Sequence, residues 1–312
     1  MQKKIYILLC LSGICLAGLF VGGPSRFSPR SYKALWDLGH VVAFSLWSYM
    51  LLRSWRKIST ASFLIQCVLV LFFTLCVGVL IEIVQGSIGR SSSLADVLND
   101  LLGSLITLAC YRSSRQQLDR RLLRVLQLGV LGLVLVTLLP FAYAVLDEAV
   151  AKRQFPVLSN FETPFEIGRW KGNNAELTRD RRFAKEGHAS LKVSLSTAQY
   201  SGAILAYFPR DWRRFQCLQL DIFTESPTLS RVHCRIHDIG HAMSTEQAHD
   251  DRFNATFALH QGWNTLTVSL KQVHDAPLRR DMDLAGIDAL GIFVVQLPAP
   301  ETLYIDRVHL IE

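Results

Sequence analysis

The sequence predicts a multidomain membrane protein, in which an α-helical transmembrane bundle of five spans is followed by an all-β sandwich of the jelly-roll type. Two observations lead to this prediction. Before about residue 146, apolar residues occur in runs long enough to cross a bilayer. From residue 155 onward the pattern changes to short alternating runs. The 312 residues are enough for two domains, each with its own core.

The charge distribution follows the same division. Residues 1–151 contain 14 Lys and Arg against 7 Asp and Glu, whereas residues 152–312 contain 19 of each, so the net charge of +7 belongs to the first half. A nucleic-acid-binding protein usually carries a basic face on its soluble domain. Here the basic excess flanks apolar segments, which argues against nucleic acid as a partner and indicates membrane lipids instead.

The candidate membrane spans are segments 5–21, 35–52, 62–85, 94–111 and 125–146. Ten Lys and Arg lie at the N-terminus and in the loops on its side, against four in the first two opposite loops. The positive-inside rule therefore predicts a bacterial inner-membrane protein with a cytoplasmic N-terminus and an extracytoplasmic C-terminal half. The first segment also resembles a signal peptide; we expect it to remain as an uncleaved span, with cleavage as the alternative.

Polar residues gather at the outer ends of these predicted spans. They are Asp37 and His40 at the start of the second span, Glu82 and Gln85 at the end of the third, Arg90 in the loop, and Asp96, Asn99 and Asp100 at the start of the fourth. Their helical spacing puts each pair on one face. Ser93 is a candidate N-cap of the fourth helix, and Gly103 would allow a neighbouring helix to approach closely.

Three interpretations of this polar cluster are open. It is a structural ion-pair network, a binding site for an envelope ligand or partner, or a catalytic site in which His40 is a base oriented by Asp37, or Glu82 an acid or base. No nucleophile elbow, zinc-ligand spacing or P-loop occurs nearby.

The order of these polar residues resembles the VanZ-like membrane proteins over about residues 1–112. The matching positions are Asp37 with His40, Glu82 with Gln85, Arg90, Asp96 with Asn99, and Gly103. The resemblance implies a cell-envelope context and gives no reaction. This sequence differs from the family's pattern at Leu38 and Gly39, because a basic residue often follows the aspartate in that family. Residues 113–150 would then form a basic cytoplasmic loop and the fifth span.

Residues 155–312 predict the sandwich. Alternating runs occupy 190–195, 218–223, 231–238, 255–259, 264–270, 291–297 and 302–311. Pieces such as "EGHASLKV", "GWNTLTVSL" and "LYIDRVHL" resemble a carbohydrate-binding, galactose-binding-like jelly roll. That resemblance implies a structural calcium near the first and last strands, for which Glu162 and Asp306 are the candidates by position.

Sugar recognition needs aromatic faces and a few polar groups. The candidate ligand-binding residues are Trp170, Tyr200, Tyr207, His237 and Asp238. We expect Trp212 and Trp263, which stand at strand starts, to pack into the core. A disulfide between Cys217 and Cys234 is not expected, because a hairpin near Pro227 would not align them.

Together these features predict a non-catalytic cell-envelope membrane protein that displays an extracytoplasmic glycan- or protein-binding sandwich. The alternative is an integral-membrane enzyme that acts on a lipid-linked saccharide or another cell-wall substrate through Asp37, His40, Glu82 and Asp96. Calcium is the only cofactor that the sequence suggests.

Overall fold

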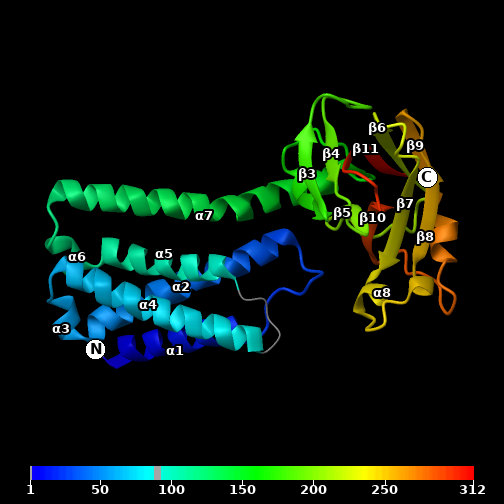
Figure 1. The fold of residues 1–312 in the computed structure, drawn as a ribbon. Helices are drawn as coiled ribbons and strands as arrows, with labels where there is room; N and C mark the ends of the chain where they lie inside the picture. The colour runs from blue at the N-terminus through cyan, green and yellow to red at the C-terminus, as the bar shows by residue number, and fades with distance from the viewer. Residues whose placement is uncertain (1, 88–92) are drawn as a thin grey trace. The chain divides into compact units, whose positions relative to one another are not determined.

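The computed structural model describes the chain except residues 1 and 88–92, and it divides into two compact units, Met1–Ala142 and Tyr143–Glu312. The first unit is helical and the second is a β-sandwich, as predicted (Figure 1). The helices are α1 (Gln2–Phe20), α2 (Arg30–Ser54), α3 (Arg56–Ser59), α4 (Phe63–Ser87), α5 (Leu94–Cys110), α6 (Arg112–Gln116) and α7 (Arg120–Gln154).

Among the described residues, three helices are long and apolar enough to cross a membrane: α2, α4 and α7. The shorter apolar segment Tyr6–Phe20 of α1 and the 17-residue helix α5 do not reach that length. At 1.5 Å per residue, α5 is about 25 Å long, shorter than the ~30 Å hydrocarbon core of a bilayer. Length and composition thus support three spans, not the five predicted from the sequence.

Helix α5 packs most closely against α2, and Gly103 makes this possible. A Cβ at residue 103 would collide with the Val41 carbonyl oxygen and lie 2.9 Å from the Ser45 nitrogen. The Ser45 hydroxyl donates a hydrogen bond to the Gly103 carbonyl (3.0 Å). The prediction that Gly103 permits a close helix contact is therefore confirmed, as is the Ser93 N-cap, whose hydroxyl accepts the Ala95 N–H.

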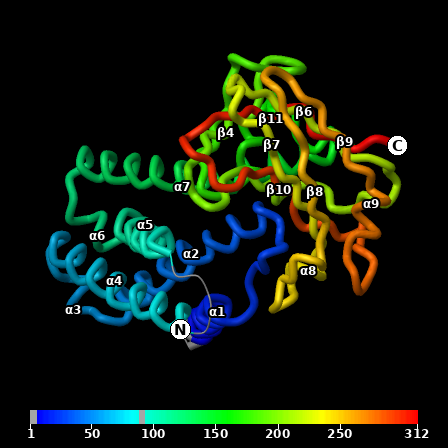
Figure 2. The backbone as a smooth tube through the Cα atoms, turned by 45° about the vertical axis from the view of Figure 1, so that its right-hand side comes forward, coloured from blue at the N-terminus to red at the C-terminus, as the bar shows by residue number. Residues whose placement is uncertain are grey.

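The sandwich consists of two antiparallel sheets that share one apolar core (Figures 1 and 2). Sheet A has the order β3 (Ala175–Asp180), β4 (Ser190–Leu195), β11 (Glu301–Ile311), β6 (Cys217–Thr224), β9 (Gly262–Ser269), and β1 (Val157–Ser159) also pairs with β11. Sheet B has the order β2 (Trp170–Asn173), β5 (Tyr200–Leu205), β10 (Ile287–Val295), β7 (Arg231–Asp238), β8 (Phe253–Ala258).

Short helices complete the sandwich. They are the 3₁₀ turns η1 (Glu166–Arg169) and η2 (His249–Asp251) and the α-helices α8 (Ile239–Met243) and α9 (Leu270–His274). Cys217 and Cys234 are free, as predicted. Trp212 is fully buried, as predicted, but Trp263 is half-buried and packs against Phe223 on the side of β9 that faces away from the core.

The second unit contains a buried guanidinium, Arg169, which has no exposed surface. Its Nε donates to Asp147 Oδ1 at 2.9 Å, and its Nη1 donates to the Leu158 carbonyl oxygen at 2.7 Å. Glu166 lies 3.7 Å from the same group. Asp147 belongs to the last turns of α7, so these turns are part of the sandwich unit, which begins before the predicted domain start at residue 155.

The substitution Asp147→Asn should destabilise a fragment of residues 143–312 by roughly 3 kcal/mol, because it leaves Arg169 buried without its main counter-charge. Urea unfolding followed by circular dichroism measures this loss. The control Glu176→Gln, at an exposed position of β3, should change the free energy of unfolding by less than about 0.5 kcal/mol. Equal stability of the two variants would show that Arg169 does not depend on Asp147.

Candidate functional site

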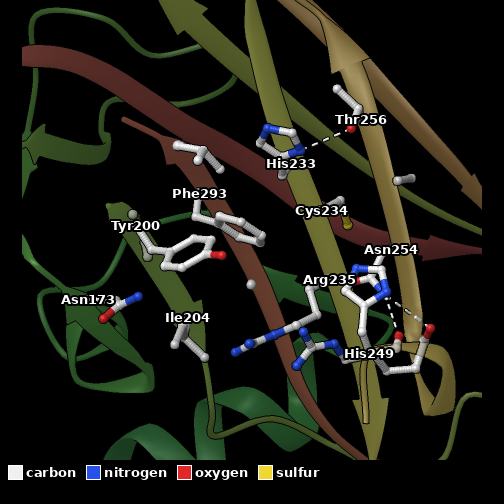
Figure 3. Close-up of a pocket in the computed structure, with 16 residues that line it drawn as sticks. Asn173, Tyr200, Ile204, His233, Cys234, Arg235, His249, Asn254, Thr256 and Phe293 are labelled. Atoms are coloured by element: carbon white, nitrogen blue, oxygen red, sulfur yellow. Dashed lines mark hydrogen bonds between the residues drawn. The ribbon is translucent and has the colours of Figure 1, made fainter. Parts of the chain in front are cut away.

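The outer face of sheet B carries a cleft of about 540 Å³, within the usual size of ligand sites. The strand register builds it from two rows of residues that face the same side. One row is Asn173, Gly202, Phe293, His233 and Thr256. The next row is Ile204, Gly291, Arg235 and Asn254. Figure 3 shows side chains of both rows. Alternate residues of each strand thus form a site opposite the core.

Two glycines keep the middle of this cleft open. At Gly202 a Cβ would collide with the Ile292 carbonyl oxygen, so this position excludes any side chain. At Gly291 a Cβ would meet nothing closer than the Arg235 side chain at 3.9 Å. Folding therefore does not require glycine at residue 291. Because Gly291 has no side chain, it leaves room on the floor of the cleft.

An aromatic stripe runs across the cleft from β5 to β7 (Figure 3). The His233 ring stacks on Phe293, with centroids 5.4 Å apart and an interplanar angle of 24°. The Tyr200 ring meets Phe293 edge to face at 5.9 Å. His233 Nδ1 pairs with the Thr256 hydroxyl at 2.9 Å, and burial lowers the pKa of His233, which favours the neutral form of the ring.

Two arginines, Arg235 and Arg252, give the cleft a positive charge. Burial, together with the nearby charge of Arg252, lowers the pKa of the Arg235 guanidinium, and burial also lowers the pKa of Arg252. The Nε atoms of both are buried and have no hydrogen-bond partner among the described residues. Two partly desolvated cations with unused donors favour an anionic ligand.

Of the residues expected to bind a ligand, Tyr200 lines this cleft and the others lie elsewhere. Trp170 is 5% exposed, packs against Phe161 and donates its Nε1–H to Ser159 Oγ, so it belongs to the core. Tyr207 lies under the Lys171 ammonium, 5.4 Å from its ring centroid, and is not among the lining residues.

His237 and Asp238 are buried at the end of β7. His237 Nε2 lies 3.5 Å from Asp288 Oδ2. Asp238 caps α8 by accepting the His241 N–H at 2.8 Å and pairs with Arg280 Nη1 at 2.5 Å. Burial opposes the ionised form, but the Arg280 hydrogen bond and the backbone donors leave the pKa of Asp238 below its usual range. Asp238 is therefore engaged in holding the turn after β7.

The carboxylates of Glu162 and Asp306, the calcium ligands predicted from the sequence, accept hydrogen bonds from backbone N–H groups. Glu162 Oε1 accepts the N–H groups of His188 (2.7 Å) and Ala189 (3.1 Å). Asp306 Oδ2 accepts those of Lys185 (2.7 Å) and Glu186 (3.2 Å). Both side chains fasten the loop between β3 and β4.

The structure brings together most of the predicted polar cluster of the helical unit. His40 Nδ1 lies 2.8 Å from Asp100 Oδ1, and both residues are buried. Glu82 Oε2 accepts the Ser93 N–H at 2.7 Å. His40, Glu82 and Asp96 offer ligand atoms that all lie within 4.8 Å of one another.

The remaining members of the predicted cluster make contacts with the backbone. Gln85 donates from Nε2 to the Leu19 carbonyl oxygen at 2.7 Å. Asn99 donates to the carbonyl oxygen of Asp37 at 3.3 Å, so this contact does not involve the Asp37 carboxylate. Arg90 lies outside the described residues.

Comparison with known proteins finds similarity in the sandwich. A family 11 carbohydrate-binding module from Clostridium thermocellum, described in complex with a β-1,3-1,4-mixed-linked tetrasaccharide, matches 50% of this chain and 94% of its own, with 17% identity and a TM-score of 0.38. An exo-β-agarase matches 49% of this chain and 24% of its own, with 16% identity and a TM-score of 0.40. No protein-family model and no curated protein matches the chain. The VanZ-like resemblance therefore stays a prediction, and the sandwich assignment rests on the strand order.

We expect the thermal unfolding midpoint of the 143–312 fragment to be the same in excess EDTA and in millimolar calcium, because N–H donors occupy Glu162 and Asp306. The variant Glu162→Gln should unfold at a lower temperature in both conditions, since it weakens the charge-assisted bonds to the loop. A midpoint that rises with calcium in the wild type but not in Glu162→Gln would instead establish a calcium site there.

Proposed function

We propose that this chain is a membrane-anchored binding protein whose sandwich cleft takes an acidic saccharide of the cell envelope. The observation that carries the proposal is the cleft on sheet B, in which an aromatic stripe lies beside two arginines with unused donors. Saccharides are bound where apolar ring faces meet aromatic side chains and their hydroxyl groups meet a few fixed polar groups.

Each wall of the cleft has a role in this proposal. Phe293 and Tyr200 offer apolar surface for a sugar ring, and Asn254 and Thr256 on β8 offer polar groups beside it. Arg235 would form charge-assisted hydrogen bonds with a carboxylate such as that of a uronic acid. A neutral sugar would leave the guanidinium groups of the cleft partly desolvated and unpaired, so the cleft should discriminate in favour of the charged ligand.

The helical half would act as the membrane anchor. Exposed apolar side chains cover α4 and α7, including Leu64, Phe72, Leu128 and Val136. The proposal keeps the five-span topology of the VanZ-like resemblance, in which α1 and α5 cross as short helices packed against the longer ones. In that topology, the ten basic residues on one side against four on the other support a sandwich outside the cytoplasm of a bacterial cell.

Binding of uronic-acid oligosaccharides to the 143–312 fragment should be measurable by calorimetry and should exceed binding of neutral oligosaccharides of the same length. Arg235→Gln should weaken binding by at least about 10-fold, because a hydrogen bond to a charged group contributes ~1.5–3 kcal/mol. Gly291→Val should abolish binding by filling the floor of the cleft while the unfolding midpoint changes little.

The matched control is Arg214→Gln, which removes an exposed arginine outside the cleft and should bind like the wild type. Equal affinity for acidic and neutral oligosaccharides would contradict the ligand class. Unchanged binding by both Arg235→Gln and Gly291→Val would show that the cleft is not the site.

Reporter fusions test the topology. A fusion after Arg121 should report a cytoplasmic position, and one after Lys152 should report the opposite side, because the long apolar helix α7 lies between them. An alkaline phosphatase and β-galactosidase pair measures both. Activity on the same side at the two positions would exclude α7 as a span, and a cytoplasmic report after Lys152 would exclude an extracytoplasmic sandwich.

A further inference from the structure

Three helices bring one ligand group each to a common point in the helical unit. His40 comes from α2, Glu82 from α4 and Asp96 from α5, and their ligand atoms lie within 4.8 Å of one another. His40 and Glu82 are 4% and 8% exposed, whereas Asp96 is half-buried. These three groups could therefore hold one metal ion between them.

Asp100 prepares His40 for this role. The pair between Asp100 Oδ1 and His40 Nδ1 fixes the ring orientation, and with the proton on Nδ1 it leaves Nε2 as a lone-pair donor. Metal-binding histidines commonly have such a carboxylate on the second ring nitrogen, which orients the ring and raises its basicity. Asp100 is completely buried on the neighbouring helix, so it cannot easily exchange this partner for water.

An unsatisfied oxygen points to a missing ligand. Glu82 Oε2 accepts the Ser93 N–H, but Oε1 is buried and has no hydrogen-bond partner among the described residues. Asp100 Oδ2 is also buried and has no hydrogen-bond partner among the described residues. Burying a carboxylate oxygen without a partner is costly, and a cation would offset that cost.

We infer that His40, Glu82 and Asp96 bind a divalent transition-metal ion of the zinc or manganese class, with Asp100 as a positioning residue for His40. One imidazole and two carboxylates suit these ions. Calcium prefers six to eight oxygen ligands, and a soft ion would need thiolates. Three protein ligands leave at least one coordination position for water or an anionic group.

The test uses the full-length protein, purified in detergent, with Zn²⁺ in equilibrium dialysis. A second group of possible ligands, His274, Asp275 and Asp281, lies exposed on the sandwich unit, so His274→Ala is the matched control. We expect the wild type and His274→Ala to retain one tightly bound zinc ion per chain. His40→Ala, Glu82→Gln and Asp96→Asn should each lose that ion.

Asp100→Asn separates positioning from ligation. This variant should still bind one zinc ion per chain, but its affinity for zinc should be weaker by about 10–100-fold, the usual effect of removing such a partner. Tight zinc binding that disappears in His274→Ala, or persists unchanged in Glu82→Gln and His40→Ala, would overturn the assignment. If these variants fail to accumulate, zinc-edge X-ray absorption of the His274→Ala protein decides: we expect one imidazole among oxygen ligands, and a shell without imidazole overturns the inference.

Discussion

Each strand of sheet B has to bury one side against sheet A, and this constraint determines which residues form the cleft. On β7 the side chains of Val232, Cys234 and Ile236 are buried in the core. The residues between them, His233 and Arg235, must then point outward. Because β10 and β8 pair with β7 in fixed register, the outward residues of all three strands come together. The cleft is therefore a consequence of the same alternation that builds the core.

The strands with strong alternation were predictable from the sequence, and the weaker ones were not. Segments 190–195 and 231–238 match β4 and β7. In contrast, β2 contains Gly172 and ends in asparagine, and β5 contains Gly202, so neither has a continuous apolar pattern. These are the strands that complete one side of the cleft. Because neither strand was predicted, the residues that lie beside Tyr200 in the cleft were not predicted either.

The prediction of the binding residues was incomplete for a related reason. The sequence favoured tryptophan and tyrosine as binding residues, but Trp170, at the start of the edge strand β2, packs into the core beside Phe161. Arg235 and Phe293 were overlooked, although the alternation of their strands already implied that they face outward. Assigning the two faces of each strand before choosing aromatic residues would have found both. The contact between Arg235 and Gly291 depends on register, which the sequence alone does not provide.

In the helical unit, spacing predicted which residues share a face but not which of them pair. His40 was expected beside Asp37, one turn away on the same helix; the structure pairs it with Asp100, which Gly103 brings close by allowing α5 to approach α2. The buried charges of the two units then differ in kind. Arg169 has the Asp147 carboxylate as a counter-charge in direct contact and also donates to a carbonyl oxygen, and only its Nη2 lacks a hydrogen-bond partner among the described residues. Glu82 retains a buried oxygen without a described partner. A buried charge that contacts an opposite charge needs only folding to explain it, whereas a buried carboxylate beside an oriented histidine and other carboxylates is better explained by a cationic ligand.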